Sequence, residues 1–422
     1  MCGIIGYVGR RPAEEILLAG LRRLEYRGYD SAGISVLADG EIRAVRAVGN
    51  LDRLEAALAD AGGGVATIAP PATIGIGHTR WATHGRVSEE NAHPHCDSAG
   101  RVHVVVNGIV ENYMSLRERL RADGAVFSSE TDAEVIAHLI ATLYDEDLAS
   151  TVVRALGELE GFFSFVAMSL DEPDVLVAAR RECPLVVGRG ADESFVASAV
   201  PAFLAHTRRA QLVENGEVVV VRAGAVEILD AAGGRVEREI TQIDWDEETA
   251  EKGGYETFML KEIHDQAQAL ADTINDRTVG GGVDLSDPGV FDESLLHGVS
   301  RVVFLACGTA YHAGLMGRYA IEEWAGLPVE VEIASEYRYR NPILGPTDLV
   351  IGISQSGETA DTLGAMRTAR DRGARVVALT NVMGSQATRE ADGVLYTRAG
   401  LEIGVAATKT FVCQVAVLQL LA

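Results

Sequence analysis

The sequence predicts an α+β domain followed by an α/β domain with a doubly wound parallel sheet. In the first half, short runs of β-branched residues are closely spaced and separated by turns and a few helical segments. Beyond residue 300, continuous apolar runs alternate with helical segments instead. The chain has 422 residues, of which 47% are hydrophobic and 23% charged. These proportions are ordinary for a folded chain, and the length suggests two or three domains.

The first half contains more predicted strands than helices. Apolar residues at helical spacing predict helices over residues 12–24, 112–122 and 131–144. This density of strands suggests two stacked sheets with helices outside them. Strands are expected at residues 4–8, 32–37, 42–48, 74–77, 102–107, 162–169, 175–179 and 218–222.

An acidic run divides the chain. Its carboxylates precede Gly253 and Gly254, and this composition predicts a solvated linker. The run consists of Asp244, Asp246, Glu247, Glu248 and Glu251. We therefore expect a first domain at residues 2–240, a linker at 241–256 and a second domain at 257–422.

The second half reads as buried strands that alternate with helices, the pattern of a parallel sheet. Helices are expected after residue 309 as far as residue 324, and after residue 359 as far as residue 372. An apolar helix over residues 408–422 stops without a glycine cap, so it either docks on a neighbour or belongs to a longer chain. The strands are expected at residues 302–306, 329–333, 349–353, 376–380 and 394–396.

Charge and cysteine usage exclude several classes of function. The formal net charge of −24 argues against nucleic acid and anionic membranes as partners. Five dispersed cysteines without a CxxC pair argue against a disulfide framework or a zinc site. We find neither a membrane-spanning apolar stretch nor a signal peptide, and we expect a cytoplasmic protein.

Cys2 is a candidate nucleophile. Removal of Met1 would give it a free α-amine, whose pKa of about 7.7–8.0 suits a general base. The alternative is an incidental second residue. Asn107 and Gly108 follow an apolar run, where a side-chain amide and a backbone N–H could form an oxyanion hole.

Two charged residues could bind charged groups of a substrate. Arg80, in the segment 78–85, suits a carboxylate. Asp132 could bind an ammonium group or cap the helix that follows it. His93 and His95 have a spacing that metal ligands use, but no third ligand pattern accompanies them, and we expect no metal.

A hydroxyl-rich loop, residues 354–359, lies between a predicted strand and a predicted helix. Ligands of parallel sheets bind at this edge, and a helix N-terminus offers N–H groups to a phosphate. A simple capping loop is the alternative.

These motifs together resemble a known family, the isomerizing glutamine–fructose-6-phosphate aminotransferases, or glucosamine-6-phosphate synthases. Residues 1–4, 24–33, 78–85, 91–95, 107–108 and 130–132 resemble their glutaminase domain, a four-layer N-terminal-nucleophile sandwich. Residues 306–309, 354–362 and 402–406 resemble the first half of their sugar-isomerase (SIS) domain. The resemblance implies hexosamine synthesis from glutamine and fructose 6-phosphate, without a cofactor or metal.

The resemblance also implies roles for individual residues. Cys2 would attack the glutamine amide, with Asn107 and the Gly108 N–H as the oxyanion hole. Arg80 would hold the α-carboxylate of glutamine and Asp132 its α-ammonium. The remaining assignments are Thr83 and His84 in the glutamine pocket, Trp81 as an ammonia gate or as core packing, Ser354, Gln355, Ser356 and Thr359 around the sugar phosphate, and Thr309 and Val405 at the edges of that pocket.

Several positions depart from the family pattern. Ala310 and Cys183 stand where relatives place serine, and Ala199 stands in place of aspartate. Asp265 and Ala267 alter a Lys-Glu-Ile-x-Glu-Gln-Pro motif. Cys307 is expected to be a small buried residue. The departures suggest a divergent member of the family.

Family members continue through a second sheet domain that carries the Schiff-base lysine and the isomerising residues. We therefore expect glutaminase chemistry and half of the sugar site, but not the complete synthase reaction. A homo-oligomer is expected, partly because residues 411–421 form an apolar terminus that we predict to be exposed. The competing hypothesis is a non-catalytic phosphosugar-binding regulator or a subunit completed by a partner. Amidophosphoribosyltransferases and asparagine synthetases share the N-terminal chemistry, but the 354–359 loop disfavours both.

Overall fold

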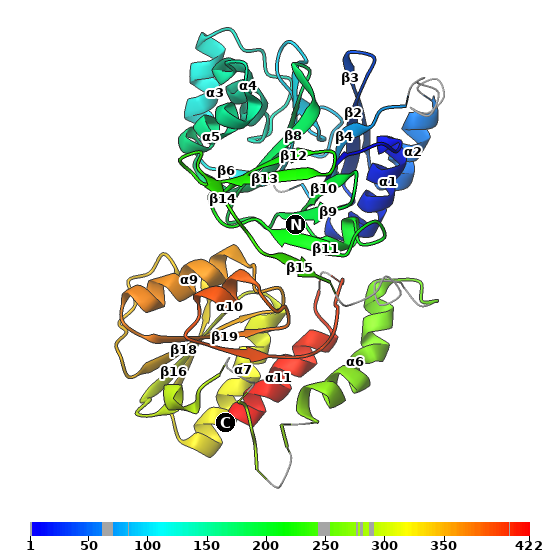
Figure 1. The fold of residues 1–422 in the computed structure, drawn as a ribbon. Helices are drawn as coiled ribbons and strands as arrows, with labels where there is room; N and C mark the ends of the chain where they lie inside the picture. The colour runs from blue at the N-terminus through cyan, green and yellow to red at the C-terminus, as the bar shows by residue number, and fades with distance from the viewer. Residues whose placement is uncertain are drawn as a thin grey trace. The chain divides into compact units, whose positions relative to one another are not determined.

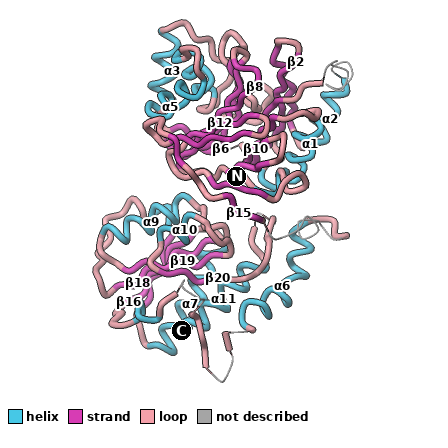
Figure 2. The backbone as a smooth tube through the Cα atoms, in the orientation of Figure 1, coloured by secondary structure: helices cyan, strands magenta, loops and turns pink. Residues whose placement is uncertain are grey.

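The structure, a computed structural model, describes residues 2–60, 71–82, 84–243, 254–275, 277–278, 282–286, 291–404 and 406–422. The chain divides into two compact units, Met1–Thr249 and Ala250–Ala422 (Figures 1 and 2). Most of the predicted acidic linker, residues 244–253, lies outside the described residues. The boundaries 2–240, 241–256 and 257–422 stay a prediction.

The described part of the first unit contains an eight-stranded antiparallel sheet, with strand order β15-β11-β9-β10-β1-β4-β2-β3. Strand β1 lies between β10 and β4. The residue that precedes β1 therefore lies at the end of an inner strand, with a strand on either side. The strands are β1 (Gly3–Val8), β2 (Ser31–Ala38), β3 (Glu41–Val48), β4 (Ile74–Arg80), β9 (Val186–Arg189), β10 (Ser194–Ala197), β11 (Arg209–Leu212) and β15 (Ile240–Gln242).

A second antiparallel sheet, of seven described strands, has the order β14-β13-β12-β8-β7-β6-β5. The long neighbouring strands β6 and β7 place Asn107 opposite Ser164. The strands are β5 (His95–Cys96), β6 (Val102–Val110), β7 (Gly161–Ser169), β8 (Glu172–Arg181), β12 (Val218–Arg222), β13 (Ala225–Leu229) and β14 (Arg235–Val236).

Alternating side chains make the two sheets the inner layers of a sandwich. In β1, Ile4 and Val8 join the core between the sheets, whereas Ile5 and Tyr7 face the core under the outer helices. Successive side chains of a strand point to opposite faces, so a strand buried on both sides is apolar throughout. This explains the unbroken apolar run Gly3–Val8.

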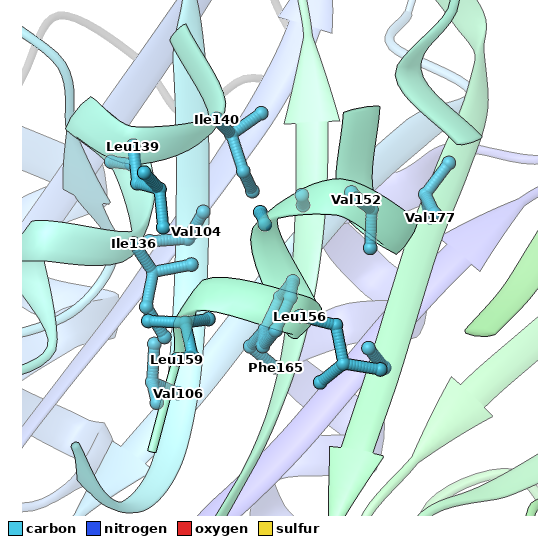
Figure 3. Packing of buried hydrophobic residues seen from close by; sticks show 14 of the residues in the cluster. Val104, Val106, Ile136, Leu139, Ile140, Val152, Leu156, Leu159, Phe165 and Val177 are labelled. Carbon is cyan, nitrogen blue, oxygen red and sulfur yellow. The ribbon is translucent and has the colours of Figure 1, made fainter. Parts of the chain in front are cut away.

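Helices cover the outer face of each sheet of the first unit (Figure 1). The eight-stranded sheet packs against α1 (Ala13–Leu24) and α2 (Leu51–Asp60). The seven-stranded sheet packs against α3 (Tyr113–Ala122), α4 (Glu134–Leu143) and α5 (Leu148–Glu158). Figure 3 shows side chains of α4 and α5 packed with Phe165 and Val177 of the sheet. Two 3-10 turns, Glu25–Arg27 and Val200–Ala202, complete the unit as described. The predicted four-layer sandwich is confirmed.

The second unit, as described, is built on a five-stranded parallel sheet with strand order β17-β16-β18-β19-β20. The predicted doubly wound sheet is therefore confirmed. The strands are β16 (Arg301–Ala306), β17 (Val329–Ile333), β18 (Asp348–Ser354), β19 (Arg375–Thr380) and β20 (Gly393–Tyr396).

Helices cover both faces of this parallel sheet (Figure 1). One face, with Phe304, packs against α7 and α11, whereas Val303 and Leu305 point to the opposite face with α8, α9 and α10. The helices are α6 (Phe258–Ile274), α7 (Thr309–Ala320), α8 (Ala334–Tyr337), α9 (Ala360–Asp371), α10 (Gln386–Glu390) and α11 (Lys409–Leu421), with a 3-10 turn at Glu293–Leu296 and a π turn at Ile321–Ala325.

The apolar C-terminal helix is not an exposed surface. Cys413, Val417 and Leu418 of α11 are fully buried, and the helix packs against α6 and α7 of its own unit. The prediction of an exposed terminus at residues 411–421 is therefore wrong. Apolar residues are spread around α11 because the helix has contacts on two sides. The sheet and α7 contact one side of α11, and α6 contacts the other. Cys307 is half-buried rather than buried.

Candidate active site

Cys2 immediately precedes β1, an inner strand of the eight-stranded sheet, and lies where that strand begins. Its Sγ accepts a hydrogen bond from the backbone N–H of Trp81 at 3.2 Å and lies 3.5 Å from the Trp81 carbonyl oxygen. Burial raises the pKa of the Cys2 thiol above its ordinary value. The resting group is therefore a thiol, and a nucleophilic role requires a base to remove its proton.

Asn107 and Gly108 lie beside Cys2 although they come from the other sheet. The Asn107 Nδ2 donates to the Cys2 carbonyl oxygen at 3.1 Å. Gly108 has φ +95°, and a Cβ at this position would lie 1.9 Å from the Phe162 oxygen. Only glycine fits here, so the backbone N–H of residue 108 stays unobstructed by a side chain.

A small pocket joins these residues to the predicted glutamine-binding residues. Its volume is about 20 Å³. Strand β4, strand β6 and the loop before α4 each contribute to its wall. The lining residues are Cys2, Arg80, Trp81, His84, His93, Val106, Gly108, Thr131, Asp132 and Ala133.

Arg80 brings a buried positive charge to the pocket, with 3% of its surface exposed. Its guanidinium donates to the carbonyl oxygens of His84 at 2.5 Å, Gly85 at 3.2 Å and Arg86 at 3.2 Å. Burial lowers the pKa of Arg80, but a guanidinium remains charged in proteins. The side chain therefore organises the loop that follows β4 and supplies a cation to the pocket.

Asp132 brings the opposite charge. Its Oδ2 accepts the Val110 N–H at 2.7 Å, and its Oδ1 lies 3.6 Å from the His84 Nδ1. Helix α4 begins only at Glu134 and has no side-chain cap at Ala133. The helix-cap interpretation of Asp132 is therefore wrong, because this carboxylate is held by strand β6 and faces the pocket.

The other predicted glutamine-site residues lie along the same loop. The half-buried Trp81 packs edge-on against Tyr29, with ring centroids 5.6 Å apart. The His84 Nε2 lies 3.2 Å from the Tyr113 hydroxyl oxygen. Thr83 lies outside the described residues.

Sequence reasoning gave His78 no role of its own and considered His93 and His95 only as metal ligands; all three are buried. His78 and His93 stack with centroids 4.1 Å apart, and His93 packs against His95 at 4.3 Å. In the part of the chain that the structure describes, no group of three or more His, Cys, Asp or Glu side chains is arranged to hold a metal ion. Their sequence signal was that His78, His93 and His95 all stand in apolar or strand-like surroundings, where a polar side chain needs a partner.

The predicted phosphate loop lies at the point where the order of the parallel strands reverses. Strand β16 leads to the edge strand β17, whereas its neighbour β18 leads the other way, to β19. The loops after β16 and β18 therefore flank the crevice in which such sheets bind ligands. Ala306 and Ile353 pair at the ends of these two strands.

The hydroxyls of this loop are brought together at the start of α9. The Ser354 Oγ lies 2.9 Å from the Thr359 Oγ1 and accepts the Gly357 N–H at 3.1 Å. The Ser356 Oγ accepts the Glu358 N–H at 3.2 Å. Gln355 is held through its carbonyl oxygen, which accepts the Asn381 N–H at 3.1 Å.

Within the described residues, no contact with the 354–359 loop is established for the other predicted sugar-site residues. Thr309 is the first residue of α7, and Val405 lies outside the described residues. Thr359 stands at the N-cap position of α9 but makes no side-chain capping hydrogen bond. The Thr359 side chain therefore does not cap α9.

Three of the departures from the family pattern have clear structural surroundings. The Cys183 Sγ lies 2.9 Å from the position a Cβ of Gly108 would take, and burial raises the pKa of Cys183 to about 12. Asp265 forms an ion pair with the Lys409 ammonium at 3.5 Å. Ala310 is buried on the sheet side of α7. Nothing in the structure explains Ala199 or Ala267.

Comparison with known proteins accounts for both units. A family described as a glutamine amidotransferase domain matches residues 78–205, and one described as the SIS domain matches residues 295–422. The chain is 51% identical over 427 residues to the isomerizing glutamine–fructose-6-phosphate aminotransferase of Mycobacterium bovis, covering 99% of this chain and 68% of the relative. The enzymes of that name from Symbiobacterium thermophilum and Streptomyces coelicolor are each 50% identical over 424 residues, covering 100% of this chain and 68% of the relative. The chain therefore belongs to the family of isomerizing glutamine–fructose-6-phosphate aminotransferases.

Proposed function

We propose that this chain hydrolyses glutamine at Cys2 and passes the ammonia to fructose 6-phosphate, which gives glucosamine 6-phosphate for hexosamine synthesis. One observation carries the proposal. Strands β4 and β6 and the loop before α4 bring Arg80, Gly108 and Asp132 to the same pocket as Cys2. The pocket thus combines a nucleophile, an oxyanion hole and charges of both signs for an amino acid.

The α-amine of Cys2 is the base that the thiol requires. Within the described residues, the hydrogen-bond partners of Sγ are backbone groups of Trp81. His93 also lines the pocket, but its Nδ1 accepts the Val106 N–H at 3.3 Å. Burial keeps His93 neutral, so its proton is on Nε2 and no lone pair remains to accept another. An N-terminal amine, exposed once Met1 is removed, has the pKa for this role.

The reaction then follows nucleophilic acyl transfer. Sγ forms a bond to the amide carbon of glutamine while its proton passes to the α-amine, and the carbonyl electron pair moves onto the oxygen. The Asn107 Nδ2 and the Gly108 N–H stabilise this oxyanion. Collapse breaks the carbon–nitrogen bond, the leaving nitrogen takes the proton, and ammonia departs. Water hydrolyses the thioester to glutamate and restores the thiol.

The charged residues of the pocket select the substrate. Arg80 binds the α-carboxylate of glutamine and Asp132 binds its α-ammonium group, each through charge-assisted hydrogen bonds. His84 and Trp81 line the pocket, and the family motif assigns Thr83 to glutamine binding and Trp81 to control of the passage of ammonia. These assignments rest on the family motif together with the surroundings of Arg80 and Asp132.

The second unit binds the sugar phosphate. Hydroxyls of Ser354, Ser356 and Thr359 and the N–H groups at the start of α9 suit a phosphomonoester without lysine or arginine. Gln355 contributes to the same loop. The family motif assigns Thr309 and Val405 to the edges of the sugar site. The position of this loop at the reversal of strand order supports the assignment.

We also propose the domain boundaries 2–240, 241–256 and 257–422, a cytoplasmic location and a homo-oligomer. All five cysteines are unpaired, and a thiol nucleophile must stay reduced, which supports a reducing compartment. No helix among the described residues is long and apolar enough to cross a bilayer.

The test measures glutamate release from glutamine, with and without fructose 6-phosphate, and glucosamine 6-phosphate in the same samples. Intact mass first establishes that Met1 has been removed. We expect glutamate from the processed protein, none from Cys2→Ser, and wild-type release from Cys96→Ser, whose cysteine lies outside the pocket. Amino sugar together with glutamate supports the whole proposal, and glutamate alone supports its glutaminase half. Processed protein that binds fructose 6-phosphate but releases no glutamate contradicts the proposal and favours a regulator.

A further inference from the structure

His78 lies directly behind the proposed oxyanion hole. It belongs to β4, pairs with Ile4 in β1 and Gly33 in β2, and has no exposed surface. Its Nε2 lies 2.9 Å from the Val106 oxygen and 3.2 Å from the Asn107 Oδ1. It therefore touches the side chain of the oxyanion residue without lining the pocket.

The chemistry of these contacts determines where the protons are. Burial lowers the pKa of His78 to about 3, so the imidazole is neutral at physiological pH and carries one proton. The Val106 carbonyl can only accept, so that proton is on Nε2. The Asn107 atom that faces the same Nε2–H must also be an acceptor, which is Oδ1.

This hydrogen bond fixes the orientation of the Asn107 carboxamide. With Oδ1 held by His78, Nδ2 points to the Cys2 carbonyl oxygen at 3.1 Å. A flipped amide would set the Asn107 N–H₂ against the His78 N–H and its oxygen against the Cys2 oxygen. Two donor–acceptor pairs would become two repulsive contacts, so the flip is strongly disfavoured.

The backbone beside Asn107 is held by histidines as well. Strand β5 pairs with β6 only through His95 and Cys96, opposite Val104 and His103. At Val106, further along that edge, the N–H is accepted by His93 Nδ1 and the carbonyl oxygen accepts from His78 Nε2. The imidazoles thus replace the missing strand at the residue that precedes the oxyanion hole.

We infer that His78 is a positioning residue of the glutaminase reaction, which orients the Asn107 amide so that its N–H groups face the nucleophile and the developing oxyanion. The inference rests on the proposed function and extends it. One Asn107 N–H is bound to the Cys2 oxygen, and the second is the one left for the oxyanion. His78 contacts neither the thiol nor the glutamine site, so its effect passes through Asn107.

The test compares His78→Leu, which removes the donor, with His78→Gln, whose side-chain amide supplies N–H groups at a similar reach. His103→Gln is the matched control, since His103 is also a buried histidine but bonds the Ser35 hydroxyl at 2.9 Å, outside the pocket. For each variant we would measure kcat and KM for glutamine hydrolysis. Two further readouts are independent of turnover: the rate of Cys2 alkylation by iodoacetamide, and the affinity for the γ-aldehyde analogue of glutamine.

These readouts separate an oxyanion effect from a structural one. Alkylation displaces iodide without forming an oxyanion, whereas the aldehyde forms a thiohemiacetal that needs the oxyanion hole. We expect His78→Leu to lower kcat and aldehyde affinity about 100-fold each, with KM and the alkylation rate within about threefold of wild type. His78→Gln should recover to within about tenfold, and His103→Gln should match wild type.

Three results would overturn the inference: a His78→Leu kcat within threefold of wild type, an alkylation rate that falls in parallel with kcat, or a His78→Gln variant as impaired as His78→Leu. Wild-type protein that releases no glutamate but binds the aldehyde, with binding lost only in His78→Leu, would refute the proposed function and support the positioning role. Wild-type protein that does neither would refute both.

Discussion

A single backbone position decides whether the proposed oxyanion hole can form. Gly108 combines φ +95° with a strand neighbour, Phe162, whose oxygen occupies the space of a Cβ. The hole therefore needs glycine for two independent reasons, conformation and close approach.

Gly108→Ala should abolish at least 99% of glutamine hydrolysis and lower the free energy of unfolding by about 2–4 kcal/mol. Gly100→Ala is the control, because Gly100 has φ +66° but no atom within 4 Å of its Cβ position. That variant should lose only about 1 kcal/mol and keep its activity. Steady-state kinetics and denaturant unfolding measure both effects, and equal behaviour of the two variants would refute the close-approach argument.

Asp132→Asn tests the ammonium assignment without dismantling the fold, because an asparagine oxygen can still accept the Val110 N–H. Loss of the charge should raise the KM for glutamine by 10- to 100-fold, the value of a charged hydrogen bond of about 1.5–3 kcal/mol. We expect kcat to change less than tenfold.

Asp97→Asn is the matched control for Asp132→Asn. Its buried carboxylate accepts from the N–H groups of Ala99, Arg101 and Val102, outside the pocket. A glutamine analogue without the α-amino group should bind wild type and Asp132→Asn equally well. Retained discrimination against that analogue in Asp132→Asn would place the ammonium elsewhere.

At the scale of elements, the start of α4 positions the acidic side of the pocket. The buried Glu134 carboxylate accepts from the backbone N–H and the hydroxyl of both Ser128 and Ser129. Burial alone would raise the pKa of Glu134, but His138 and these serine donors hold it well below its ordinary value. The ionised carboxylate therefore ties down the segment that leads into Thr131 and Asp132.

Helices α7 and α11 pack through a glycine contact. A Cβ at Gly317 would lie 2.8 Å from the Leu418 Cδ1 and 2.9 Å from its Cβ. We expect Gly317→Ala to destabilise the second unit by about 1–3 kcal/mol through overpacking, and Leu418→Ala by about 2–5 kcal/mol through a cavity. The double variant should cost less than the sum, since the new methyl fills part of the cavity.

Gly157→Ala provides the control for helix propensity. Gly157 lies in α5 with no atom within 4 Å of its Cβ position, so alanine there should stabilise by about 0.5–1 kcal/mol. Denaturant unfolding of the single and double variants measures the coupling. Strictly additive costs at Gly317 and Leu418 would show that the two residues do not share this contact.

At the scale of the molecule, the two units should respond differently to acid. Burial lowers the pKa of His78 and of His95 to about 3 and places that of His93 well below its usual value. All three belong to the first unit.

In the second unit, burial raises the pKa of Glu262, and a raised carboxyl pKa works in the opposite sense. Burial also opposes the ionisation of Asp348 and of Glu390. Hydrogen bonds from Arg301 and Arg367 outweigh burial and lower the pKa of these two carboxyls, which costs stability only below the ordinary carboxyl pKa of about 4.

The first unit should therefore lose stability as the pH falls from about 6.5 towards 3. Below pH 6.5 these histidines bind protons in the unfolded state but not in the folded state. The free energy of unfolding therefore falls by about 1.4 kcal/mol per pH unit for each histidine. Hydrogen exchange, corrected for intrinsic rates, should show protection falling in β4 and β6 well before β16 and β18. His95→Gln should reduce the pH dependence, and equal loss in both units would contradict the assignment.

Local sequence patterns were sufficient for the long elements. The apolar runs in β1, β6, β7, β16 and β18 mark strands buried on both faces, and the helical spacing of α1 marks one buried side. The fold class and the family could be predicted because the periodicity of apolar residues and the spacing of motifs can be read directly from the sequence. Strands of four residues, such as Val186–Arg189 and Ser194–Ala197, are too short to show a period.

The nucleophile and the oxyanion-hole pair could be proposed from residue types and their place in the chain, whereas glutamine as the ligand of Arg80 and Asp132 followed from the family resemblance. His78 and Asn107 are 29 residues apart in the sequence and belong to different sheets. The local sequence around either residue does not predict their contact. Tertiary structure also decided that Asp132 serves the pocket rather than a helix end, and that α11 is buried. The physical reason is the same in each case. Sequence periodicity records which side of an element is buried, whereas the partner that buries it is chosen by packing between distant segments.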